Sequence, residues 1–61
     1  MNEVMLIIEG EKVAYHLYKS NIQPIAGDVI TISDNEVFTV KRRLLGGVDN
    51  SNKIICFGIL E

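Results

Sequence analysis

Residues 22–40 decide the fold, and they read IQPIAGDVITISDNEVFTV. A segment broken by Pro24 leads through Gly27 and Asp28 into two alternating strands with a turn between them. Proline cannot donate a hydrogen bond to a central sheet ladder, and it favours an extended residue before it. We therefore expect a crossing segment over residues 20–27 that ends in a tight corner, at which the Asp28 carboxylate accepts hydrogen bonds from the main chain. Two side chains of this segment are expected to turn inward and seal one end of the barrel: Ile22 and Ile25.

The hairpin over residues 29–44 admits two turns. A two-residue turn would put Phe38 on the face opposite Ile30 and Ile32. A three-residue loop at 33–35, with Asn35 in the left-handed conformation, gathers the apolar side chains on one face instead. We predict the longer loop because it builds a core. That core would contain Ile30, Ile32, Phe38 and Val40, and the outward residues would be Val29, Thr31, Val37 and Thr39.

A first hairpin is predicted from two β-rich runs, residues 4–8 and 13–18, that flank the sequence EGEK. Gly10 can take the positive φ that a two-residue turn needs at its first central position. With Gly10 and Glu11 as the turn, the numbers of facing residues sum to 21. The pairs are then Glu9 with Lys12, Ile8 with Val13, Leu6 with Tyr15 and Val4 with Leu17. One face becomes wholly apolar or aromatic: Val4, Leu6, Ile8, Val13, Tyr15 and Leu17.

The second face of this hairpin is the first candidate site. Its members are Glu3, Met5, Ile7, Glu9, Lys12, Ala14, His16 and Tyr18. The middle of the face is apolar, and monomers seldom leave contiguous apolar patches open. We therefore predict a partner-binding patch of Met5, Ile7, His16 and Tyr18. The alternative is that Met5 and Ile7 are scattered surface residues or are covered by another part of the barrel.

A basic cluster is the second candidate site. Lys41, Arg42 and Arg43 follow one another, and Lys53 opens the last strand, residues 53–60. Such a cluster commonly protects an exposed strand edge, and it could also contact a phosphate or an acidic partner. The net charge of −2 argues against general binding of a phosphate backbone. Gly58, within an apolar strand, indicates a bulge or a close main-chain approach.

Size and composition limit the remaining possibilities. A chain of 61 residues forms one domain, 1–61, and buries too little surface to be very stable alone. One cysteine and one histidine are too few for a disulfide or a zinc site within the chain, so we expect no cofactor and no metal. The 48% of hydrophobic residues favour self-association, with a dimer preferred. No paired catalytic groups are evident, and Cys56 lies in the most apolar strand, so we expect no enzyme.

Location follows from the same composition. A single free thiol suits the cytosol. The apolar run at residues 4–8 is too short for a signal or membrane helix. We expect a cytoplasmic protein, in the bacterial or host-cell cytosol, without helices and without a membrane contact.

The order of these features resembles the small SH3-like β-barrel proteins that bacteria, phages and mobile elements encode. The likeness lies in the proline, the Gly-Asp corner, the alternating strand VITI, the turn, the FTV segment and the final apolar strand. It implies five strongly bent antiparallel strands, a non-enzymatic protein-binding role and, for phage proteins of this kind, inhibition of a host defence protein. The alternatives are a nucleic-acid binder using the basic cluster, a virion assembly component, and a sponge for a nucleotide signal with Arg42 or Arg43 at a subunit junction.

Overall fold

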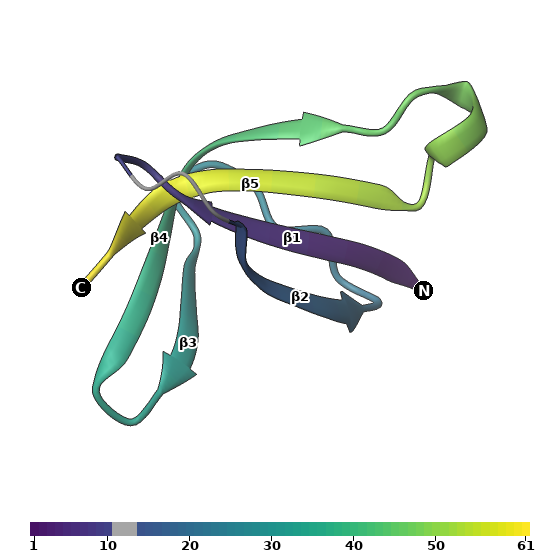
Figure 1. The fold of residues 1–61 in the computed structure, drawn as a ribbon. Helices are drawn as coiled ribbons and strands as arrows, with labels where there is room; N and C mark the ends of the chain where they lie inside the picture. Colours follow the sequence, from purple (N-terminus) through teal and green to yellow (C-terminus); the bar gives the residue numbers. More distant parts are fainter. Residues whose placement is uncertain (11–13) are drawn as a thin grey trace.

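The computed structural model describes residues 1–10 and 14–61, of which 14 and 15 by their main chain only. The described residues form five strands, with one 3-10 turn before the last: β1 (Asn2–Ile8), β2 (Ala14–Ser20), β3 (Val29–Ser33), β4 (Glu36–Leu45), η1 (Val48–Asn50) and β5 (Lys53–Leu60). They form one sheet in the order β2-β1-β5-β4-β3, curled into a half-barrel (Figure 1). In the described part of the chain, no helix has the length and apolarity that a membrane crossing needs.

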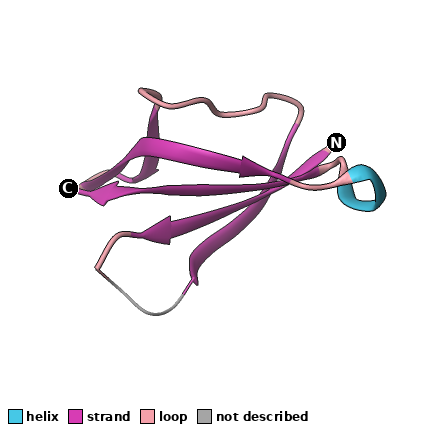
Figure 2. Ribbon diagram, turned by 90° about the horizontal axis from the view of Figure 1, so that it is seen from above, coloured by secondary structure: helices cyan, strands magenta, loops and turns pink. Residues whose placement is uncertain are grey.

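The all-β prediction is confirmed, but the expected antiparallel barrel is correct only in part. β1 and β5 run parallel, so that Leu6 lies beside Cys56 and Val4 beside Ile54. The sheet also does not close, because β2 and β3 each have a neighbour on one side only. Seen from above, the curved sheet is open, and η1 projects beyond it near the N-terminus (Figure 2). The crossing segment explains the topology: it carries the chain from one sheet edge to the other, so β5 enters between β4 and β1.

The predicted register of the first hairpin is wrong by one residue over most of its length. Leu6 pairs with His16 instead of Tyr15, and Val4 pairs with Tyr18 instead of Leu17. The cause is a register shift beside Leu6, at which β2 contains one more residue than β1. A one-residue shift exchanges the two faces of a strand. Gly10 has the expected positive φ of 87°, whereas the Glu9–Lys12 and Ile8–Val13 pairs lie outside the described residues.

The register of the second hairpin is confirmed, although its turn differs. Ile30 pairs with Phe38, as the core argument requires. Asn35 is not left-handed, since no non-glycine residue in the described ranges has a positive φ. A two-residue turn follows the Ser33–Glu36 pair, and a shift between Thr31 and Ser33 restores the register. The extra residue that the prediction placed in the loop therefore lies in a bulge between Thr31 and Ser33.

The core lies on the concave side of the sheet. Its fully buried residues are Val4, Leu6, Phe38, Val40, Ile54 and Cys56. Partly buried side chains pack around it: Ile8, Tyr18, Ile30, Ile32 and Leu60. All five strands contribute, which explains why so short a chain can form one continuous core.

The crossing segment does not seal the barrel as predicted. Ile22 is 75% exposed and Ile25 is 52% exposed. Pro24 is the buried residue of the segment, and its carbonyl oxygen accepts a hydrogen bond of 3.2 Å from Arg43 Nη1. Because the main chain at Pro24 is held against β4, the two isoleucines flank the contact and do not enter the core.

The Gly27–Asp28 corner has the structural role that the sequence predicts. Asp28 Oδ2 accepts a hydrogen bond of 2.9 Å from the Ile25 N–H, and the Asp28 N–H donates to the Ile25 carbonyl at 3.1 Å. Gly27 has a φ of 97°, which the third residue of such a turn requires. Val40 joins this corner to β4, because its N–H donates to the Asp28 carbonyl.

Candidate protein-binding surface

The convex face of the sheet carries an apolar row across four strands. Met5 on β1 lies beside Leu17 of β2 on one side and beside Ile55 of β5 on the other. Ile55 in turn lies opposite Leu44 of β4. The two ends of the row are well exposed, at 66% for Leu17 and 54% for Leu44. We call these four residues the outer row.

An aromatic residue lies next to the outer row. Phe57 follows Ile55 by two residues on β5, so both point to the convex face, where Ile7 lies beside Phe57. Arg42 is the register partner of Phe57 on the other side, and its guanidinium lies 4.0 Å from the ring centre. A cation over an aromatic face is attracted by the ring. Arginine and aromatic side chains are also enriched among the residues that dominate binding energy at interfaces.

The convex face is hollowed beside the outer row. A depression of about 180 Å³ is lined by Met5, Leu17 and Ile55 together with two charged residues, Glu3 and Lys53. Glu3 and Lys53 are register partners across β1 and β5, and Lys19 lies opposite Glu3 on β2. The row therefore has an apolar centre and, at one end, a rim with charges of both signs.

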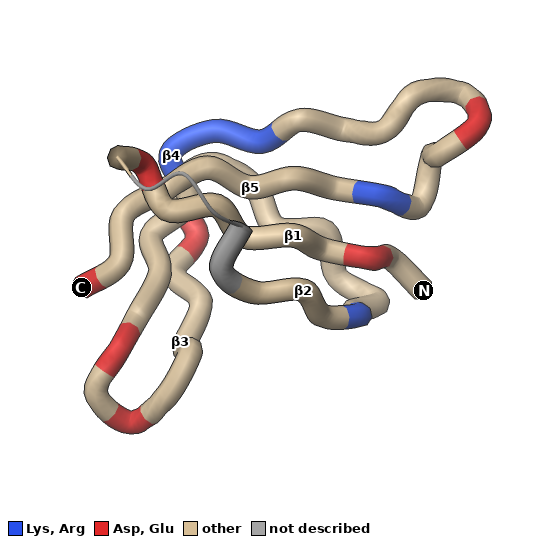
Figure 3. Tube along the Cα trace, in the orientation of Figure 1, with Lys and Arg blue, Asp and Glu red and all other residues tan. Residues whose placement is uncertain are grey.

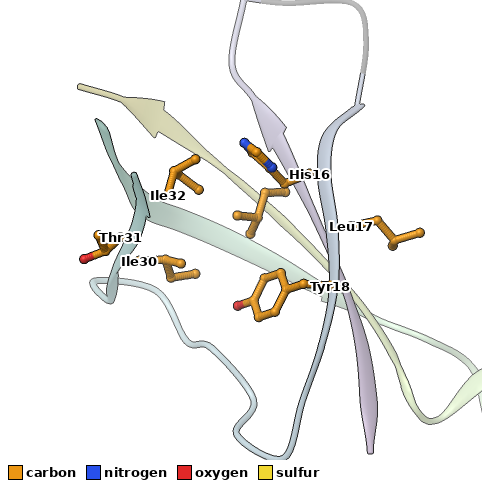
Figure 4. A pocket seen from close by; sticks show the side chains of 7 residues that line it. His16, Leu17, Tyr18, Ile30, Thr31 and Ile32 are labelled. Atoms are coloured by element: carbon orange, nitrogen blue, oxygen red, sulfur yellow. The ribbon is translucent and has the colours of Figure 1, made fainter. Parts of the chain in front are cut away.

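The structure divides the predicted partner-binding patch. Met5 and Ile7 lie on the convex face, as expected, whereas His16 and Tyr18 point to the concave side (Figure 4). Leu17, which the predicted register places on the apolar face with Val4 and Leu6, lies on the other side of β2 from Tyr18 and replaces His16 and Tyr18 on the convex face. The grouping of the four residues was wrong because the register was wrong.

The predicted basic cluster is likewise not one surface. Arg42 stacks on Phe57 on the convex face, while Arg43 binds the carbonyl of Pro24. Lys41 is the extra residue of a bulge opposite Gly58, and Lys53 lies beside Glu3. Figure 3 shows these cations along the bend of β4 and at the start of β5. Their divided directions and the nearby carboxylate do not favour a phosphate site.

Comparison with family models, curated proteins and solved structures finds no match to this chain. The surfaces must therefore be interpreted from their own chemistry.

A second hollow lies on the concave side, between the two edge strands. It is a cavity of about 200 Å³ whose lining includes Leu6, His16, Tyr18, Ile30 and Ile32. Figure 4 shows the Tyr18 ring directed across this space from β2 towards Ile30 of β3.

Tyr18, which lines this cavity, and the buried Cys56 both have raised pKa values. Burial raises the pKa of the Tyr18 hydroxyl, and the negative charges of ionised Cys56 and of Asp28 raise it further. Burial also raises the pKa of the Cys56 thiol; Arg43 opposes this increase, and Asp28 adds to it. A protonated, fully buried thiol is a poor nucleophile. Within residues 1–10 and 14–61, no three His, Cys, Asp or Glu residues gather into a metal site.

Proposed function

We propose that this protein is a non-enzymatic protein-binding module, and that the convex face of its sheet is the contact surface. The observation that carries the proposal is the outer row, in which Leu17, Met5, Ile55 and Leu44 lie side by side on four strands. In the described part of the chain, no element packs over this row, and its two ends are more than half exposed. Open apolar patches of this kind are typical of interaction sites.

The surface suits a protein partner better than a small ligand. Small-molecule sites are concave, have volumes of roughly 300–1,000 Å³ and enclose most of the ligand, whereas the outer row extends across a sheet face and its depression measures only about 180 Å³. An apolar centre, an Arg–aromatic pair and a charged rim are the usual parts of a protein interface. The partner should present an apolar patch with charges of both signs at its border, to face Glu3, Lys19 and Lys53.

Such binding would also serve the inhibitor role that the SH3-like resemblance implies, since masking a surface needs no catalytic group. The dimer expected from composition is a separate prediction. A second copy of this chain would have to cover the same row if it used the convex face. The mass of the native complex therefore distinguishes a foreign partner from self-association.

The test uses charges at the two exposed ends of the row. Leu17→Glu and Leu44→Glu should leave the fold intact, because both side chains are already in contact with water. The matched control is Val48→Glu on η1, where an exposed apolar residue lies outside the row. Each tagged variant is used to capture proteins from a bacterial lysate, and the captured protein is then purified and titrated against each variant.

The two row variants should bind the purified partner at least about tenfold more weakly than wild type, because a charge buried at an interface without a counter-ion is costly. Val48→Glu should bind normally. If wild type, Leu17→Glu and Leu44→Glu bind the partner equally well, the convex face is not the contact surface.

A further inference from the structure

The two edges of the open sheet differ in how they are protected. β2 ends in Lys19-Ser20, whereas β3 reads VITIS and contains no charge and no proline. Exposed edge strands are usually protected by charges, proline or a covering element, because their free main-chain groups pair readily with another strand. Val29 is 61% exposed at this edge. β3 is therefore an unprotected strand that favours pairing.

The main-chain direction at β3 follows from a hydrogen bond at its start. The Val40 N–H donates to the Asp28 carbonyl at 2.8 Å, so the main chain of Asp28 faces β4. The ladder of an antiparallel pair alternates from residue to residue. The N–H and C=O groups of Val29 and Thr31 therefore point away from β4, towards the free edge. These are the groups that an additional strand would bind.

The cavity of about 200 Å³ lies beside this edge, and Ile30 and Ile32 of β3 line it. A strand added antiparallel to β3 would place every second side chain on the same concave side. An apolar protein cavity of about 150 Å³ is large enough for benzene. The space therefore admits one large aliphatic or aromatic side chain of the added strand.

The acidic residues near β3 determine which kind of strand can pair with its free edge. Asp28 precedes β3 and Asp34 follows it, and Figure 3 shows acidic residues along the β3–β4 hairpin. If two copies of β3 paired antiparallel about Thr31, Asp28 of one would face Asp34 of the other. Like charges directly opposite one another destabilise a strand pair. The edge therefore suits a strand with basic ends better than a second copy of itself.

We propose that the free edge of β3 and the adjoining cavity bind an extended segment of another protein by β-strand addition. One apolar side chain of that segment enters the cavity, and its Lys or Arg residues lie opposite Asp28 and Asp34. This site lies on the concave side, borders the outer row only at Leu17, and does not depend on the function proposed for the convex face.

The probe is a panel of seven-residue peptides, acetylated and amidated at their ends. Each has Lys at both ends, Thr at the second, fourth and sixth positions, and Leu, Ile, Val or Phe at the third and fifth positions, which face the concave side and one of which enters the cavity. One control series has Glu in place of Lys. The other has proline at the central position, opposite Thr31, where the added strand must donate a hydrogen bond. Affinity is measured by fluorescence anisotropy, and amide hydrogen exchange locates the contact.

At least one Lys-ended peptide should bind and slow the exchange of the Val29 and Thr31 amides. The proline peptide should bind at least about tenfold more weakly, because it loses main-chain hydrogen bonds. Thr31→Pro should cause the same loss, and circular dichroism checks that this variant remains folded. If Thr31→Pro does not fold, Asp34→Lys provides the test. This variant should weaken the binding of the Lys-ended peptides and strengthen the binding of the Glu-ended peptides.

Leu44→Glu on the convex face is the matched control and should bind the peptides normally, because Leu44 is exposed and does not line the cavity. If no peptide slows exchange at Val29 and Thr31, or if Thr31→Pro binds as wild type does, the proposal is wrong. Loss of peptide binding in Leu44→Glu also overturns it, because the peptide would then occupy the convex face.

Discussion

The main chain of Gly58 lies so close to the carbonyl oxygen of Thr39 that a Cβ atom at position 58 would overlap that oxygen. The same Cβ would lie 2.9 Å from two ring atoms of Phe38, a fully buried core residue. Gly58 faces Val40 at the point where Lys41 bulges from β4. This glycine therefore allows the bend of β4 to be covered closely by β5.

Gly58→Ala should lower the free energy of unfolding by at least about 1–3 kcal/mol, because overpacking moves either the main chain or the core. Gly47→Ala is the matched control: nothing lies within 4 Å of a Cβ at that position, and its φ of −75° is ordinary. Urea unfolding of both variants checks the prediction. Equal stability of Gly58→Ala and wild type would contradict the close approach.

Asp28→Ala should destabilise the protein by about 1 kcal/mol, because the Ile25 N–H loses its carboxylate partner. Asp28→Asn retains a side-chain oxygen and should recover most of that loss. Thermal unfolding of the two variants measures the difference. A loss of equal size in Asn and Ala would show that the charge of Asp28, and not its hydrogen bond, stabilises the corner.

Cys56 should react with thiol reagents only when the protein opens. Its side chain has no exposed surface, and burial raises its pKa. Labelling with a chromogenic disulfide should be slow in buffer and should accelerate with urea. Cys56→Val combined with Ser51→Cys gives the control, because position 51 lies in an exposed loop. Rapid labelling of wild type without denaturant would refute the burial of this thiol.

Stability should fall in alkaline solution. Tyr18 and Cys56 both have folded-state pKa values above their ordinary values of 10.0 and 9.0, so ionisation favours the unfolded chain. Their contribution is fully present below pH 9 and is lost as pH rises through 9 and 10 towards the folded-state pKa values. Tyr18→Phe should flatten the decline above pH 10. An unfolding free energy that stays constant up to pH 11, measured with urea, would contradict this.

The sequence predicted the strands well because alternation and turn residues are local. Residues 53–60 and the second hairpin were placed correctly, and Ile30 opposite Phe38 followed from the need for one apolar face. The two bulges were not predictable, because an unpaired residue leaves no mark in a period-two pattern. One bulge exchanged the faces of β2 and so moved His16 and Tyr18 out of the candidate site and Leu17 into it.

The sheet order could not be predicted either. Nothing in residues 2–8 specifies that β1 pairs in parallel with β5, since that contact joins segments far apart in the chain. The exposure of Ile22 and Ile25 has a similar origin, because the direction of these side chains depends on the contact between Arg43 and the main chain of Pro24. Local sequence patterns predict only the features that are determined by residues close together in the chain.

The parallel pair of β1 and β5 has a kinetic consequence. The first and last strands in sequence form the middle of the sheet, so nearly the whole chain must be looped before the central ladder can form. Loop closure costs entropy before any of these contacts repay it, and high contact order slows folding. This small domain should therefore acquire its structure late and cooperatively, when its two outermost segments meet.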